Sequence, residues 1–318
     1  MAKKLQILSI MSELGAGTRG SSLGFDALKM ASLKYDYRFF TKRNVKRVKT
    51  ENDLIFKKST RKFAKRLDGI ERMYRNIEKE VSQKLKNNFF PVVFSGDHSN
   101  AGGTISGIKT AYPKKRLGVI WIDAHADLHS PYTSPSGNVH GMPLATAVHD
   151  DNLENQNNQP SEETIWHWNE MKGSNQRVKH SDLFFIGVRD TEEPEENMMK
   201  THNIPNVTTD ELRAKGVKEV AKMALEHLKD CEMIYISFDV DSMDPSVSRG
   251  TGTPVDNGLT EDEARDLILY LVDDKRLCCF ETTEINPLLD DKGNAMAEAA
   301  FRVVKPVIEK IESKLIAK

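Results

Sequence analysis

The sequence has little of what marks secreted, membrane-spanning or nucleic-acid-binding proteins. Only three of its 318 residues are cysteines, and two of them, Cys278 and Cys279, are adjacent, which excludes a disulfide framework. No apolar run approaches the ~20 residues of a membrane helix, and the N-terminal run is too short for a signal peptide. Lysine and arginine (46) balance aspartate and glutamate (47), so the chain lacks the positive surplus that binds nucleic acid or anionic membranes. We therefore expect a cytoplasmic protein with neither nucleic acid nor a membrane as partner.

The sequence does contain the patterns of an α/β protein. Hydrophobic residues make up 38% of the chain and charged residues 29%, which is typical of globular proteins. Short apolar runs without polar alternation predict strands of a parallel sheet that is covered on both faces, at residues 5–10, 91–95, 117–122, 183–188, 233–238 and 278–285. Amphipathic patterns predict helices at residues 60–86, 101–112, 218–228, 261–272 and 296–315. We expect a single α/β domain over residues 1–318.

Three local patterns refine this picture. Thr260 and Glu263 form a T-x-x-E capping box for the helix that follows. The polar residues 150–175 predict a surface excursion with one short helix. Residues 15–20 match G-x-G-x-x-G, but the motif starts well beyond the first apolar run and lacks the partner acid of a dinucleotide site. We therefore expect a loop that needs glycine for its conformation.

A D-x-H-x-D motif directly follows the apolar run that ends at Ile122. In an extended chain every second side chain points to the same side, so Asp123, His125 and Asp127 would converge. Carboxylate oxygens and an imidazole nitrogen suit divalent ions such as Mn²⁺, Fe²⁺ or Zn²⁺. Taken alone, the motif is equally compatible with a solvated loop.

Two further groups of polar residues follow predicted strands. Asp239 and Asp241 come after the run that ends at Phe238, and His98 comes after residues 91–95. Alone, each signal is weak, because acids two apart are common in loops and a lone histidine is more often a core residue. The carboxyl ends of parallel strands, however, lie at one edge of the sheet, where ligands bind. We therefore expect all three groups to meet there.

The combined set has too many ligands for one catalytic ion with an open position. It contains four carboxylates, which would repel one another strongly without cations. It fits two divalent ions that share carboxylates and activate a water molecule between them. The sequence therefore predicts a two-metal hydrolytic site.

The motifs, taken in order, resemble the ureohydrolase family and within it the arginase branch. The matching segments are GAGTRGSSLG (15–24), GDHS (96–99), DAHAD (123–127), SGNVHG (136–141), SFDVDSMDPS (237–246), TGTPVDNGLT (251–260) and EINP (284–287). Each motif is modest by itself, but the ordered set is highly specific and covers most of the chain.

The resemblance implies a three-layer α/β/α fold with a mainly parallel central sheet, and hydrolysis of a guanidinium group to urea and an amine. It also implies a homo-oligomer, a trimer or a hexamer. The implied cofactor is a pair of Mn²⁺ ions, although the same ligands can hold other divalent ions. The implied metal ligands are His98, Asp123, His125, Asp127, Asp239 and Asp241.

The resemblance also assigns catalytic roles. Asp127 would orient the hydroxide that attacks the guanidinium carbon, and His140 would carry a proton toward the leaving amine. Glu284 would hydrogen-bond the guanidinium group, and Thr253 would line the site. His140 has a structural alternative, which is to orient a loop.

The remaining matches concern the substrate's amino-acid end. Ser136 and Asn138 match positions that contact an α-carboxylate, and Asp190 and Glu192 lie in the segment that recognises an α-amino group. His129 stands where arginases usually carry Asn, and Glu192 stands where they usually carry Asp. Both departures keep open a sister ureohydrolase acting on agmatine, a guanidino acid or formiminoglutamate. A catalytically silent metal-binding subunit is the third alternative.

Overall fold

The computed structural model describes residues 3–316, and its centre is an eight-stranded sheet in the order β2-β1-β3-β8-β7-β4-β5-β6. All neighbouring strands pair in parallel. The strands are β1 (Lys4–Ile10), β2 (Val45–Arg47), β3 (Phe89–Ser95), β4 (Leu117–Ile122), β5 (Leu183–Ile186), β6 (Asn206–Val207), β7 (Met233–Asp239) and β8 (Leu277–Thr283). The predicted parallel α/β sheet is thus confirmed.

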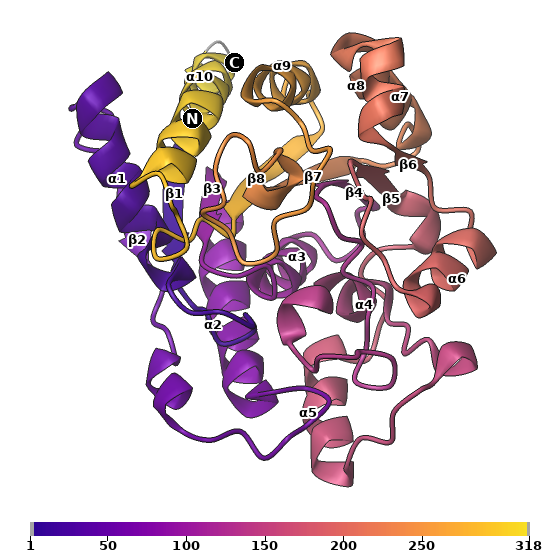
Figure 1. The fold of residues 1–318 in the computed structure, drawn as a ribbon. Coiled ribbons are helices and arrows are strands. Elements are labelled where there is room, and N and C mark those ends of the chain that lie inside the picture. Colours follow the sequence, from indigo (N-terminus) through magenta and orange to yellow (C-terminus); the bar gives the residue numbers. More distant parts are fainter. Residues whose placement is uncertain (1–2, 317–318) are drawn as a thin grey trace.

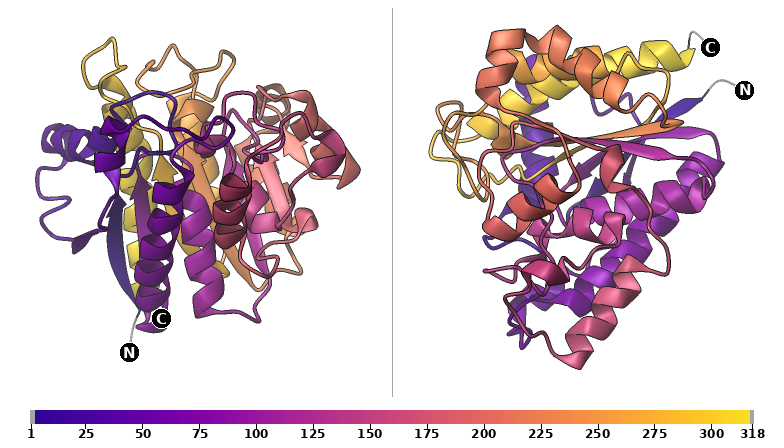
Figure 2. Two further views of the ribbon diagram at one scale, coloured as in Figure 1. Left: turned by 90° about the horizontal axis from the view of Figure 1, so that it is seen from below. Right: turned by 90° about the vertical axis from the view of Figure 1, so that its right-hand side faces the viewer.

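Helices cover both faces of the sheet, and the right-hand view of Figure 2 shows the resulting three layers. The helices are α1 (Gly24–Tyr35), α2 (Leu67–Lys86), α3 (Asn100–Ala111), α4 (Pro143–Val148), α5 (Glu162–Lys172), α6 (Glu193–Thr201), α7 (Thr209–Lys215), α8 (Val217–His227), α9 (Glu261–Leu271) and α10 (Ala295–Ile316). One layer contains α1, α10, α9 and α8, and the other contains α2, α3, α4 and α5 (Figure 1). No helix among residues 3–316 combines the length and the apolar character that crossing a membrane requires.

The hydrophobic core has two halves because neighbouring side chains of a strand point to opposite faces of the sheet. In β1, Ile7 belongs to the half beneath α1 and α10, and Leu8 belongs to the half beneath α2 and α3. In β3, Phe94 and Val93 divide in the same way. Both faces are therefore apolar, which explains why the strands read as continuous apolar runs.

The predicted elements agree with the structure except at certain boundaries and in the shortest elements. The helix predicted at residues 60–86 begins only at Leu67, because Arg66 has a left-handed backbone with φ 56°. The prediction for residues 60–66 was therefore wrong. The one short helix expected within residues 150–175 is α5, which packs against α2. Two strands, β2 and β6, were not predicted because they are too short to show a pattern. Four helices were also not predicted, namely α1, α4, α6 and α7.

The predicted capping box of α9 is present and supports a stability test. The Thr260 side chain accepts a hydrogen bond from the Glu263 backbone at 3.1 Å, and the Glu263 side chain accepts one from the Thr260 backbone at 2.8 Å. We expect Thr260→Ala to lower the free energy of unfolding by about 1 kcal/mol, because the first turn loses its side-chain acceptor. Thr260→Ser should keep most of this stability. Urea denaturation measures both variants, and equal losses would contradict a role for the hydroxyl group.

Candidate functional site

The carboxyl ends of the central strands bring the predicted residues to one cavity. His98 follows β3, Asp123 follows β4, and Asp239 is the last residue of β7. The cavity has a volume of about 230 Å³. Its lining contains every predicted site residue except Glu284, and it includes His98, Asp123, His125, Asp127, His129, Ser134, Pro135, Ser136, Asn138, His140, Gly141, Asp190, Glu192, Glu195, Asp239, Asp241 and Thr253.

The first ligand group is centred on the His98 imidazole. Its Nδ1 lies 2.9 Å from Asp123 Oδ2, 3.2 Å from Asp127 Oδ2 and 3.1 Å from Asp239 Oδ2. All four side chains are buried. One nitrogen cannot donate a proton to three carboxylates, so this convergence indicates a place for a cation.

The orientation of the His98 ring is fixed by contacts on the side away from the carboxylates. Its Nε2 lies 2.8 Å from Ser237 Oγ, and its ring stacks on the Trp121 indole with 3.9 Å between centroids. These contacts direct Nδ1 toward the carboxylates. Such fixing of the second imidazole nitrogen is usual for histidines that ligate metals.

The second ligand group is centred on His125 and shares Asp123 with the first. His125 Nδ1 lies 3.5 Å from Asp123 Oδ1 and 3.1 Å from Asp241 Oδ2. The Thr253 hydroxyl donates to Asp241 Oδ2 at 3.1 Å, and the Ala124 N–H donates to Asp241 Oδ1 at 3.2 Å. Because one Asp123 oxygen faces each histidine, this carboxylate connects the two groups.

The D-x-H-x-D segment converges for a different reason from the predicted one. The chain bends at residues 123–125 instead of continuing as an extended strand, and Asp127 has a left-handed backbone with φ 52°. The bend turns Asp123 and Asp127 toward His98. The predicted alternation along an extended chain was therefore wrong, although the three side chains do line one cavity.

The carboxyl groups of the site have shifted pKa values, because they are buried and lie close to one another. Burial raises the pKa of Asp127 to about 6 and raises the pKa values of Asp239 and Asp241. Burial also opposes ionisation of Asp123, but His125 and His98 outweigh it and lower its pKa. Burial and the neighbouring carboxylates therefore disfavour full ionisation of this cluster.

The donor set fits a pair of divalent cations. His98 Nδ1 and Asp123 Oδ2 are buried, and among the described residues neither has an acceptable hydrogen bond. Buried polar atoms without partners are costly, and a cation between them would remove that cost. Imidazole nitrogen and carboxylate oxygen are ligands of Mn²⁺, Fe²⁺ and Zn²⁺.

His140 lies beside the ligand groups and faces a buried carboxylate. Its Nδ1 is 3.4 Å from Glu284 Oε1, and the same oxygen accepts a hydrogen bond from the His98 N–H at 2.9 Å. Burial disfavours the His140 cation, but Glu284 outweighs this effect and raises the pKa of His140. Glu284 has a left-handed backbone with φ 65°, which is uncommon for a residue other than glycine. Glu284 is not among the residues that line the cavity, but it contacts His140, which does line it.

The glycine-rich loop supports His140. The Gly15 carbonyl accepts a hydrogen bond from the His140 N–H at 3.2 Å, and the Gly15 N–H donates to Asp97 Oδ2 at 2.9 Å. A Cβ atom at Gly15 would lie 2.6 Å from Ser99 Oγ. The loop therefore needs glycine because it passes so close to the GDHS segment.

His129 belongs to a third group of histidine and acids in the same cavity. Its Nε2 lies 2.8 Å from Glu192 Oε2 and 3.4 Å from Glu195 Oε2. Both glutamates come from the capping box that begins α6. Burial raises the pKa of Glu195 to about 7. Sequence reasoning missed Glu195, although the E-x-x-E spacing from Glu192 could have revealed this box.

The predicted contacts for an amino-acid head group lie at the cavity's outer part. Ser136 and Asp190 are exposed, and Ser136 Oγ accepts a hydrogen bond from the Asn138 N–H at 3.1 Å. Asn138 Oδ1 accepts a hydrogen bond from Lys65 Nζ at 3.0 Å. Lys65 was not predicted, and it adds a positive charge beside this part of the cavity.

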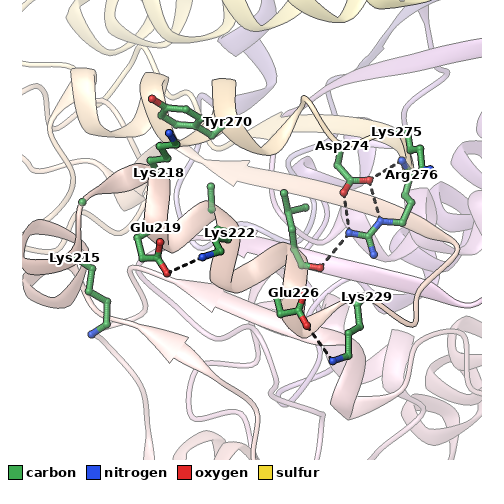
Figure 3. Close-up of a pocket in the computed structure, with 13 residues that line it drawn as sticks. Lys215, Lys218, Glu219, Lys222, Glu226, Lys229, Tyr270, Asp274, Lys275 and Arg276 are labelled. Carbon is green, nitrogen blue, oxygen red and sulfur yellow. Dashed lines mark hydrogen bonds and ion pairs between the residues drawn. The ribbon is translucent and has the colours of Figure 1, made fainter.

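A wider depression of the surface lies elsewhere, between α8 and α9, with a volume of about 1020 Å³ (Figure 3). Its lysines alternate with acids, and Lys222 and Lys229 pair with Glu219 and Glu226 at 3.7 and 3.0 Å. None of the histidine–carboxylate groups found among residues 3–316 lies in it. Within the described part of the chain, the depression therefore lacks the kind of ligand group that the candidate site contains.

Comparisons with known proteins agree with this geometry. The model of the arginase family matches residues 3–308. The arginase of Staphylococcus aureus (strain COL) is 34% identical over 309 residues, which cover 95% of this chain and 96% of that protein. The arginase of Bacillus subtilis (strain 168) is 31% identical over 319 residues, covering 98% and 99%. The crystal structure of arginase from Bacillus subtilis has a TM-score of 0.77 at 29% identity and covers 96% of this chain and 98% of that one. The chain belongs to the arginase family and is a hydrolase of the ureohydrolase type.

Proposed function

We propose that this protein is an arginase that hydrolyses L-arginine to L-ornithine and urea with two Mn²⁺ ions. The observation that carries the proposal is the pair of histidine–carboxylate groups that share Asp123 in one cavity. Similarity to proteins named arginase adds support.

The proposed metal ligands are the side chains of the two groups. Two cations bound there would supply Lewis acidity and a water molecule whose pKa is lowered toward ~7. The first group would use His98, Asp127 and Asp239, and the second would use His125 and Asp241, with Asp123 in both. Asp127 would also accept a hydrogen bond from the attacking water and so orient it.

The proton and the guanidinium group are handled by residues beside the ligands. The imidazole of His140 would carry a proton to the leaving amine. Glu284 would hold that imidazole through Oε1, where both of its contacts lie. Its predicted contact with the guanidinium group is therefore proposed through Oε2.

The substrate's head group would be read at the outer part of the cavity. The α-carboxylate of arginine would be bound by Ser136 and Asn138, and the charge of Lys65 next to Asn138 supports this choice. The α-ammonium group would be bound by Asp190 and Glu192. A substrate without a carboxylate would leave these donors without a partner, which disfavours agmatine.

The second candidate is a sister ureohydrolase for another guanidino or formimino compound. The observation that favours it is the 2.8 Å contact between His129 and Glu192, because this acid then has a partner other than an ammonium group. Assembly into a trimer or hexamer, the cytoplasmic location and the single-domain organisation stay predictions.

The direct test of the proposal is a substrate panel. Mn²⁺-loaded enzyme is offered L-arginine, agmatine, a guanidino acid and formiminoglutamate, and the release of urea or formamide is measured. We expect kcat/KM for L-arginine to exceed that of agmatine at least ~100-fold, since agmatine lacks the carboxylate that Ser136, Asn138 and the charge of Lys65 would bind. Enzyme stripped by a chelator serves as the control and should be inactive. A higher kcat/KM for another member of the panel would establish the sister activity instead.

The metal site is tested by Asp239→Ala. The variant should lose bound Mn²⁺, and urea release should fall by more than the ~10–100-fold typical of losing an outer partner of a metal site. Metal analysis and a urea assay measure the two effects, and circular dichroism checks that the variant is folded. A folded variant with full metal content and activity would refute the assignment.

The role of His140 is tested by separating metal binding from turnover. We expect His140→Ala to keep its Mn²⁺ while kcat falls ~10²–10⁴-fold, because the proton transfer to the amine is lost. Added imidazole should restore part of kcat. If kcat is unchanged, His140 has no part in the chemistry.

A further inference from the structure

A separate group of two histidines and one aspartate lies outside the candidate active site. His180 Nε2 is 3.0 Å from Asp150 Oδ2, and His202 Nε2 is 3.6 Å from the same oxygen. The three atoms all lie within 4.8 Å of one another. The residues come from three segments: the loop after α4, the short 3-10 helix before β5 and the residue that follows α6.

The hydrogen bond between Asp150 and His180 does not explain why His202 also lies beside the same carboxylate oxygen. Asp150 Oδ1 accepts a hydrogen bond from the Asn152 N–H at 2.8 Å, which directs Oδ2 toward the histidines. The rings of His180 and His202 are stacked, with centroids 3.7 Å apart and planes at 10°. His202 is too far from Asp150 for a hydrogen bond, yet its Nε2 faces the same oxygen.

The group can be reached by an ion from solvent. The side chains of Asp150, His180 and His202 keep 29%, 14% and 35% of their exposure. A cavity of about 390 Å³ borders Asp150 and His202 and also contains Glu154. Burial and the neighbouring His180 lower the pKa of His202.

We propose that Asp150, His180 and His202 form an accessory binding site for a Zn²⁺-like divalent transition metal. Two imidazole nitrogens and one carboxylate oxygen are a common ligand set for zinc, with water in the fourth position. Oxygen-preferring Mg²⁺ and Ca²⁺ are disfavoured by the two imidazoles. The site is independent of the proposed catalytic pair of ions and of the proposed substrate.

A metal at this site would restrain the C-terminal end of α6. The N-terminal end of α6 contributes Glu195 to the lining of the substrate cavity. The segment after Asp150 already contacts α6, since the Asn152 side chain donates to the Pro194 carbonyl at 2.8 Å. The ion would join His202 to the same segment. Its expected effect is thermal stabilisation of the folded chain.

The test uses the full-length Mn²⁺-loaded enzyme, titrated with Zn²⁺ and then desalted. The variants are His202→Ala and His180→Asn, and the matched control is His227→Ala at an exposed histidine on α8. Bound Zn²⁺ and bound Mn²⁺ are counted by elemental analysis, and the melting temperature is recorded for each sample.

We expect the wild type and the control to keep one additional Zn²⁺ per chain and to gain roughly 5 °C in melting temperature. Both variants should lose this Zn²⁺ and this gain while they keep their Mn²⁺, which also shows that they are folded. Equal zinc content in the wild type and both variants would overturn the proposal. So would zinc bound only in exchange for Mn²⁺. Because metal content is the readout, failure of the arginase activity would leave this test intact.

Discussion

Mutual repulsion among four buried carboxylates is the constraint on which the site depends. Three strands of one sheet end at the same edge, and Asp123, Asp127, Asp239 and Asp241 are buried there with the two histidines as their nearest compensation. In a medium of low dielectric constant, such charges are tolerated only with protons or cations between them. The fold therefore places four carboxylates where protons or bound cations must offset their charge.

The supporting contacts all serve to hold that arrangement. Backbone N–H groups of His125 and Asp241 donate to the carboxylates two residues before them at 2.8 Å, which fixes the acids at the strand ends. Trp121 and Ser237 set the His98 ring from behind. Ligands that are already held in place bind a metal ion without a large free-energy cost of reorganisation.

The sequence predicted the parts whose position follows from local pattern. The apolar runs end where the acids begin, and parallel strands share an edge, so the convergence of His98, Asp123 and Asp239 could be foreseen. The left-handed turn at Asp127 could not, because it depends on the packing of the surrounding loops. Lys65 was missed for a similar reason, since it contacts Asn138 from a segment whose place is set by tertiary contacts. Glu195 could be seen locally as part of a capping box, but not as a residue that lines the cavity.

The most direct measurement is anomalous diffraction at the manganese edge from crystals of the Mn²⁺-loaded protein. The account predicts two peaks, roughly 3.5–4 Å apart, one beside His98 and one beside His125, with Asp123 reaching both. A single peak, or none, with the four carboxylates hydrogen-bonded among themselves, would contradict it.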